Sequence, residues 1–341
     1  MATAIRQFDR LNVGIEVVST KGVLVPATRQ IVGEHTFSEE QDFYRDSYPR
    51  GFRANVGGAG TIIRKGAMLE VSGDLSAQDV LWPLMTGVLG SVAPATVDTT
   101  GKTWTFTPEL ATGVPVVQSA TTEFVRADGV TNHYYGEAGY MMTESFKFDW
   151  AFNQIAKMSW KMFGRARQTG APTGGVVPYP TRETLASNTL VTSWDTTWAG
   201  LGGTPVAGII RSASFECKSG YAANYTLAGR ADVDMTGHKA GEITGTLNIV
   251  MEFDATAAAK FALWRSNSLV FIRLLNTGSL VGAATVLQGL QIDGAYRFVG
   301  SPSFSADGDQ VTMTAQLESV LDVTSSKSLD FVVTNALAAI T

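Results

Sequence analysis

The sequence contains a single cysteine, Cys217, and only three histidines among its 341 residues. One cysteine excludes an intramolecular disulfide framework and a zinc site made of several thiolates. His35, His133 and His238 show no HExxH spacing, and the chain contains no phosphate-binding loop, nucleophile elbow or dinucleotide-binding glycine motif. We therefore predict a protein that is not an enzyme and has no catalytic residues, metal ion or cofactor.

Charged residues are scarce as well. They make up 17% of the chain, below the usual share of about a quarter, and the formal net charge is −5. The net charge argues against the clustered basic surface with which proteins hold nucleic acid, and the scarcity of charge suits extensive protein–protein contact. The first residues lack the apolar segment of a signal peptide, and no window reaches about 18 uninterrupted apolar residues. We expect synthesis in a cytoplasm and no membrane insertion.

Two stretches alternate between apolar and polar residues at the period of a β-strand. In 242–253 (EITGTLNIVMEF), every second residue is apolar, and the others are almost all small, hydroxylic or acidic. The stretch 224–235 (NYTLAGRADVDM) follows the same pattern. Alternation of this kind indicates a strand with one buried face and one wet face. The two stretches are therefore predicted to form long adjacent strands, joined by a short turn at 236–241.

The two halves of the sequence share one order of elements. Residues 66–87 and 245–266 each predict a strand followed by a short helix, capped by Asp74 or Ser76 in the first case and by Asp254 or Thr256 in the second. The helices should end near Gly87 and Asn267. Each half then closes with a hairpin, over 145–164 and 301–320, turning near Asn153 and near Asp307–Asp309.

This repetition predicts a mainly β protein made of two tandem β-sandwich or half-barrel units, each flanked by one α-helix. The first unit would span 1–167 and the second 208–341. A connector rich in glycine, proline, serine and threonine would occupy 168–207.

About thirty residues, 31–60, separate the predicted first-half strands 21–30 and 60–73. A loop of this length is uncommon unless it binds something or is disordered, and its many aromatic residues argue against a disordered linker. We interpret 31–60 as a contact arm. Its candidate contact residues are Phe37, Glu39, Glu40, Asp42, Phe43, Tyr44, Arg45, Tyr48, Arg50, Phe52 and Arg53.

Several of these stretches together resemble the major tail tube proteins of long-tailed, siphovirus-type bacteriophages. The resemblance rests on KGVLVPATRQ at 21–30, GAMLEVSGDLSAQDVLWPLMTGVLGS at 66–91, GKTWTFTPE at 101–109 and the glycine-plus-hairpin block at 134–166. It covers most of residues 13–167, whereas the second half matches only through the repeated plan.

The resemblance implies rings that stack head to tail, in which strands from every subunit pair edge to edge into one closed β-barrel around a hollow lumen. The arm at 31–60 would reach the neighbouring ring. With two units per chain, three copies would close a pseudo-six-fold ring, and a hexamer is the alternative. The expected partners are further copies of this chain and the tape measure, tail tip and tail terminator proteins. The expected location is the virion tail, assembled in the host bacterial cytoplasm.

A conduit of this kind must let DNA slide through without binding it. Duplex DNA carries about one negative charge per 1.7 Å of its axis, so a neutral-to-acidic wall suits its passage into the host. We predict that the wall includes Glu70, Ser72, Asp149, Asp232, Asp234, Glu242, Thr244, Thr246, Asn248 and Glu252. Lys147, Lys157 and Lys161 fall on the same hairpin face. Either neighbouring acids neutralise them, or that face does not line the lumen.

Other classes of protein fit parts of the pattern. A tube subunit of a contractile injection or secretion system, or another virion structural protein, would share the fold. An outer-membrane barrel also alternates along its strands, but the absence of a signal peptide and the non-aromatic C-terminal Thr341 count against it. A carbohydrate-binding or enzymatic sandwich would be marked by a clustered aromatic pocket, whereas the aromatic residues here mostly fall at core-facing strand positions.

Overall fold

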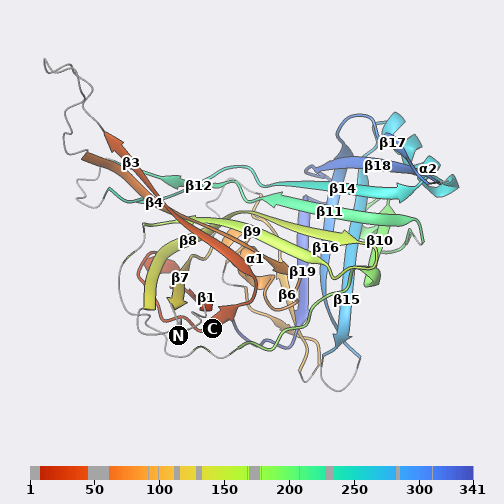
Figure 1. Ribbon diagram of the computed structural model, residues 1–341. Coiled ribbons are helices and arrows are strands. Elements are labelled where there is room, and N and C mark those ends of the chain that lie inside the picture. Colours follow the sequence, from red (N-terminus) through yellow and green to blue (C-terminus); the bar gives the residue numbers. More distant parts are fainter. Residues whose placement is uncertain are drawn as a thin grey trace, which may run out of the picture.

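A computed structural model of the chain shows a mainly β protein with two α-helices in the part that it describes (Figure 1). The described residues are 8–44, 61–90, 92–98, 100–110, 116–127, 133–166, 168, 177, 179–206, 208–226, 233–281, 285–308 and 310–340.

One antiparallel sheet runs through both halves of the chain, and we call it the long sheet. Its strand order is β3–β4–β9–β8–β11–β14–β18–β17. The bounds are β3 Glu34–Tyr44, β4 Thr61–Asp74, β9 Lys157–Gly164, β8 His133–Ala151, β11 Ile210–Lys218, β14 Thr244–Glu252, β18 Gln310–Ser319 and β17 Ser303–Asp307. The pairing of β8 with β11 joins the two halves. Within the described part of the chain, the outer edges of β3 and β17 remain unpaired, so the single chain does not close a barrel.

Further strands form a second layer. One group has the order β10–β15–β16–β19–β6–β5, and the other has the order β2–β1–β7–β8. The bounds are β10 Leu190–Asp195, β15 Val270–Leu280, β16 Leu287–Phe298, β19 Leu329–Asn335, β6 Lys102–Phe106, β5 Ala95–Thr96, β2 Arg29–Ile31, β1 Phe8–Ile15 and β7 Ala120–Ala127. Because β8 is 19 residues long, its first part belongs to this layer and its last part to the long sheet.

The core lies against one face of the long sheet and crosses the junction between the halves. Phe148 on β8 and Phe215 on β11 are fully buried and stack with ring centroids 6.4 Å apart. Leu69 on β4 and Leu247 on β14 belong to the same cluster. Each such side chain contributes about 1.5–3 kcal/mol when it is fully removed from water. The two halves therefore share one hydrophobic core.

The helices follow β4 and β14, as predicted. Helix α2 (Ala255–Arg265) begins after Asp254, whose carboxylate accepts a hydrogen bond from the Ala257 N–H at 2.9 Å, and Asn267 just beyond its end has φ 49°. Helix α1 (Leu81–Gly87) ends at the predicted Gly87, but its N-cap is Val80 and not Asp74 or Ser76. The Ser76 hydroxyl instead accepts hydrogen bonds within the preceding turn.

The predicted strand at 224–235 is wrong. The antiparallel neighbours of β14 are β11 and β18, and the predicted turn at 236–241 contains the short strand β13 (Gly237–Ala240), which pairs with β12 (Tyr221–Asn224). Tyr225, Thr226 and the described residues from Val233 to Thr236 are not in a strand. An alternating sequence shows which side of a segment could be buried in a sheet. The segment becomes part of a sheet only where another strand pairs with it.

The arm and its preceding strand also differ from the prediction. Residues 34–44 form β3, which pairs along its whole length with β4, whereas a loop was expected there. Of the strand predicted at 21–30, only its last two residues belong to a strand, β2. The two predicted hairpins are present as β8–β9 and β17–β18, with positive φ angles at Asn153 and Gly308 in the turns.

The segment predicted as a connector contains ordered structure as well as links to both halves. Strand β10 pairs with β15, and the short 3-10 helices Ser187–Thr189 and Trp198–Gly200 flank it. A third 3-10 helix, Val18–Thr20, lies near the start of the chain. The division into 1–167, 168–207 and 208–341 remains a prediction.

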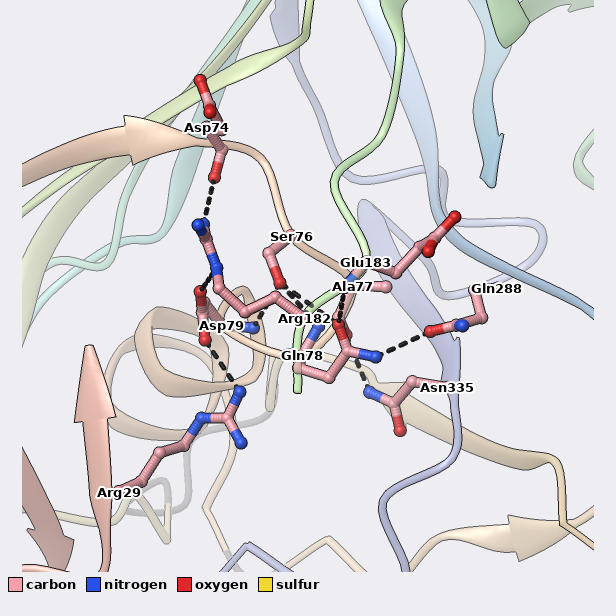
Figure 2. A network of polar contacts seen from close by, with 10 residues as sticks. All are labelled: Arg29, Asp74, Ser76, Ala77, Gln78, Asp79, Arg182, Glu183, Gln288 and Asn335. Atoms are coloured by element: carbon pink, nitrogen blue, oxygen red, sulfur yellow. Dashed lines mark hydrogen bonds and ion pairs between the residues drawn. The ribbon is translucent and has the colours of Figure 1, made fainter. Parts of the chain in front are cut away.

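A buried polar network fastens the connector to the rest of the molecule (Figure 2). The fully buried Asp79 carboxylate pairs with Arg29 at 2.9 Å and with Arg182 of the connector at 2.8 Å. The Arg182 guanidinium also donates to the Asp74 backbone carbonyl at 3.1 Å. Two mostly buried cations thus share one buried carboxylate, an arrangement that is costly to break on either side.

The same network reaches the second half through Gln78 (Figure 2). The Gln78 amide donates to Gln288 on β16 at 2.6 Å, and its oxygen accepts from the Glu183 N–H at 2.8 Å. Asn335, at the end of β19, donates to the Ala77 carbonyl at 2.7 Å. The segment between β4 and α1 is therefore held by residues from both halves and from the connector.

Candidate functional site: the polar face of the long sheet

The middle of the face of the long sheet that points away from the core is polar across both halves. Directly paired residues of neighbouring strands share a face, so the register defines rows of side chains that run across the strands. One row crosses from β3 to β18 and consists of Glu34, Ser72, Ser159, Lys147, Glu216, Thr246 and Glu318. Every member of this row is charged or hydroxylic.

The rows on either side have the same character. One consists of Thr36, Glu70, Lys161, Ser145, Lys218 and Thr244. The other consists of Asp74, Lys157, Asp149, Ser214, Asn248 and Gln316. We call the three rows together the polar face. The opposite face of the same strands carries buried residues such as Phe146 and Ile249. Polar and buried side chains therefore alternate along the strands in the region of the three rows.

Acidic neighbours pair with the three lysines of the β8–β9 hairpin. Lys161 lies 2.6 Å from Glu70, Lys157 lies 2.6 Å from Asp74, and Lys147 lies 2.8 Å from Asp149. All these side chains are exposed, so the pairs add little to stability, about 0–1 kcal/mol each. Their effect is on the local charge, because each ammonium group is balanced by a carboxylate.

The remaining charges leave the polar face slightly acidic. Its carboxylates are those of Glu34, Glu70, Asp74, Asp149, Glu216 and Glu318, and they outnumber its lysines, which are Lys147, Lys157, Lys161 and Lys218. The hydrogen bond from Lys161 to Glu70 raises the pKa of that lysine, and the Glu70 charge acts in the same direction. Lys161 is therefore held in its charged form at neutral pH.

Most of the residues predicted to line the lumen lie on this face. Glu70, Ser72, Asp149, Thr244, Thr246 and Asn248 belong to the three rows. Glu252, at the end of β14, pairs directly with Thr312 of β18 and forms an ion pair with Arg211 at 2.9 Å. Glu242 precedes the first residue of β14 and is exposed.

Asp234 is not on the sheet, contrary to the prediction, and Asp232 lies outside the described residues. The Asp234 carboxylate accepts hydrogen bonds from the backbone N–H of Ala166 at 3.0 and 3.1 Å, just after β9. Nearby, the Lys65 N–H of β4 donates to the Val233 carbonyl at 3.0 Å. Hydrogen bonds of this segment therefore connect residues of the second half to the first half.

The candidate contact residues of the arm that the structure describes, Phe37 to Tyr44, belong to β3. Phe37 packs against Phe124 with ring centroids 4.1 Å apart, so it contributes to the first-half core. Glu40 and Asp42 both pair with Arg64 of β4, at 3.2 and 2.8 Å. Glu39 and Phe43 are exposed, and Tyr44 is the last residue of the strand. Arg45, Tyr48, Arg50, Phe52 and Arg53 lie outside the described residues.

Sequence reasoning missed the contribution of β11 to the polar face. Residues 212–218 alternate between Ser212, Ser214, Glu216 and Lys218 on one side and Ala213, Phe215 and Cys217 on the other. This period-two signal was available, but nothing local in the sequence shows that β11 lies between β8 and β14. Cys217 is fully buried, and burial raises the pKa of its thiol.

Two further observations concern other kinds of site. Among the described residues, no group of three or more histidine, cysteine or acidic side chains is placed to hold a metal ion. No helix in the described part has the length and apolar character needed to cross a membrane.

An extended polar sheet face, backed by one shared core and ending in two edge strands that are unpaired among the described residues, suits a structural subunit that assembles. A family model described as phage tail tube protein matches residues 10–324. The chain belongs to this family, and it is a structural subunit of a phage tail tube in the virion. The match does not favour a contractile injection or secretion system. A search of curated proteins found no match.

Proposed function

We propose that the chain carries two tandem four-stranded units and that three copies close into a pseudo-six-fold ring. The units are β3–β4–β9–β8 and β11–β14–β18–β17. In each, the second strand in the order leads into a helix, α1 or α2, and the last two strands form a hairpin. The matching strand order supports a repeated unit more strongly than sequence similarity does.

The junction inside the chain supports a model for the contact between chains. Strand β8 ends the first unit and pairs with β11, which begins the second, from Ser145↔Lys218 to Ala151↔Ser212. Between chains, β17 ends the second unit of one copy and pairs in the same way with β3, which begins the first unit of the next copy. Such head-to-tail contacts close into a ring when the rotation fits, and closure removes the exposed strand edges. A ring of six chains is the alternative stoichiometry.

The polar face lines the lumen of this ring. The single observation that carries this proposal is the set of three rows that cross both units without one apolar side chain, with the hairpin lysines paired to acids. Mobile DNA would meet hydroxyl groups and a slight excess of negative charge. Repulsion acts over a Debye length, about 8–10 Å at ordinary ionic strength, so the wall favours passage over binding.

Rings of this kind stack into the tail of a siphovirus-type particle and conduct DNA into the host. The tape measure, tail tip and tail terminator proteins are the further partners, and assembly takes place in the host bacterial cytoplasm. The arm predicted at 31–60, part of which forms β3, contacts the neighbouring ring.

Cysteine labelling of assembled tubes tests the lumen assignment. Thr246→Cys lies at the centre of the polar face, and Val191→Cys on β10 of the second layer is the matched control, since Val191 is 46% exposed. We expect a bulky maleimide–gold reagent to label both unassembled variants but only Val191→Cys in long tubes. Equal labelling of both positions in long tubes would place Thr246 on the outer surface and contradict the proposal.

A further inference from the structure

A cluster of four partly exposed aromatic residues and one valine lies where α2 meets the open edge of the long sheet. We call it the aromatic patch, and it consists of Phe253, Phe261, Trp264, Phe304 and Val311. The Phe304 ring lies 5.0 Å from that of Phe253 and 5.4 Å from that of Phe261, both edge to face. Phe253, Phe304 and Val311 are 41%, 47% and 49% exposed. A contiguous apolar surface of this kind marks an interaction site.

The two helices differ sharply in burial, although each follows the corresponding strand of its unit. All seven residues of α1 are buried, and its Thr86 hydroxyl lies 2.7 Å from that of Thr143 on β8. In α2 only Ala257 is buried. Helix α1 lies where the first unit meets the second, whereas α2 lies where the second unit ends. Within the described part of the chain, nothing covers α2 as fully as α1 is covered.

The core-facing side chains of the long sheet differ in burial in the same way between the junction of the units and the open edge. At the β8–β11 junction the layer of these side chains continues from Phe148 to Phe215, and both residues are fully buried. On β17, Phe304 lies opposite Met313 of β18 on the core side, while Ser303 and Ser305 alternate with it. Beyond Phe304 the described chain supplies no further strand. The layer therefore reaches the open edge and stops there half exposed.

We propose that the aromatic patch docks on the first unit of a second copy of this chain, beside its β3. This inference rests on the proposed ring and adds the surface that holds neighbouring copies together. The two open edges lie far apart, with β3 at the upper left and β17 with α2 at the upper right (Figure 1). One copy therefore presents its β3 side to the α2 side of another, in a head-to-tail contact.

The charges of the two surfaces are complementary. Helix α2 carries Lys260 and Arg265, and the Arg265 guanidinium lies 4.9 Å from the centre of the Phe261 ring at the patch. On strand β3, Glu39 is exposed on the side that also carries Phe37, whereas Glu40 and Asp42 lie on the opposite side and pair with Arg64. Aromatic anchors next to an arginine are typical of the residues that dominate binding at interfaces.

The direct test is assembly of the full chain carrying Phe253→Ser and Phe304→Ser together. The matched control is Val323→Ser, because Val323 is 81% exposed and lies beyond the other end of β18. We expect the patch variant to need at least tenfold more protein than the wild type to form tubes, and the control to assemble normally. Tube formation by the patch variant at the wild-type protein concentration would overturn the inference. The proposed function would remain intact in that case, because it depends on tube formation by the wild type.

A second measurement covers the case in which the serine variant does not fold. A photo-crosslinking phenylalanine analogue at position 304 preserves an aromatic side chain, and its products in assembled tubes are mapped by mass spectrometry. We expect links to residues of β1, β2, β3 or β7 of another copy. Links confined to the same chain, or to the second unit of another copy, would contradict the inference even if rings form.

Discussion

Lys161 and Glu70 face each other across the β9–β4 pair, and the lysine Nζ lies 2.6 Å from the Glu70 carboxylate. In the proposed ring, this contact explains how lysines can lie on a surface past which DNA slides. The carboxylate holds the ammonium group in place and balances the charge of Lys161. Lys157 with Asp74 repeats the arrangement two rows away.

Removing the acid of this pair should make the conduit hold DNA. Glu70→Gln leaves Lys161 unpaired in every copy along the tube, and we expect severalfold slower DNA release from triggered phage particles, measured by dye fluorescence. The folded chain should lose no more than about 1 kcal/mol of stability, because the pair is exposed. The matched control is Glu70→Gln with Lys161→Gln, which removes both charges and should release DNA at the wild-type rate. Slow release from the double variant as well would contradict the charge argument.

Asp79→Asn should be strongly destabilising. It leaves the mostly buried Arg29 and Arg182 without their shared carboxylate, a change that typically costs about 3–5 kcal/mol. Urea unfolding of the unassembled chain measures this loss. Asp42→Asn is the control, because its pair with Arg64 is exposed and should be worth about 0–1 kcal/mol. Equal effects of the two substitutions would show that the network in Figure 2 does not hold the connector.

Mild acid should loosen the contact between β13 and the first half. The Nδ1 atom of His238 lies 3.1 Å from the Tyr140 hydroxyl, and burial, with the charge of Lys21, lowers the pKa of His238. A lowered pKa means that the unfolded state binds the proton more readily. This contribution to stability is therefore complete above the unfolded value of about 6.5 and is lost as the pH falls through and below it.

The measurement for this prediction is the free energy of unfolding between pH 5 and pH 8, for the wild type and for His238→Gln. We expect the variant to show a smaller decrease toward pH 5, since glutamine does not titrate. The distant His35→Gln substitution is the control. Identical pH profiles of wild type and His238→Gln would show that His238 does not contribute.

Cys217 should be inert in the folded chain. Its thiol is fully buried, and burial raises its pKa, so little thiolate is present for reaction. We expect no labelling by a thiol-specific chromogenic reagent over hours in native buffer, and stoichiometric labelling in strong denaturant. Thr246→Cys provides the positive control under native conditions. Rapid labelling of the native wild type would mean that β11 is not held between β8 and β14.

The sequence predicted local features of the fold well. Asp254 was recognisable as a helix cap because a short carboxylate before an apolar helix satisfies free backbone N–H groups. The hairpin turns at Asn153 and Gly308 and the alternating faces of β14 and β18 were equally local. Each of these features depends on residues only a few positions apart.

Features that depend on distant residues were not predictable in the same way. The junction of β8 with β11 joins residues more than sixty positions apart, and the alternation of Ser214 and Glu216 does not say which strands lie beside them. The segment 224–235 alternates too, yet Asp234 accepts hydrogen bonds from Ala166 and lies off the sheet. Edge strand β3 was predicted as a loop, because its mostly exposed, charged residues obscure the period of a strand.

Cryo-electron microscopy of assembled tubes tests the central claim most directly. We predict rings of three chains in which β17 of one copy pairs with β3 of the next, and in which Ser72, Glu216 and Thr246 point into a continuous lumen. Rings in which these side chains lie on the outer surface of the tube, or in which another face of the sheet lines the channel, would contradict the account.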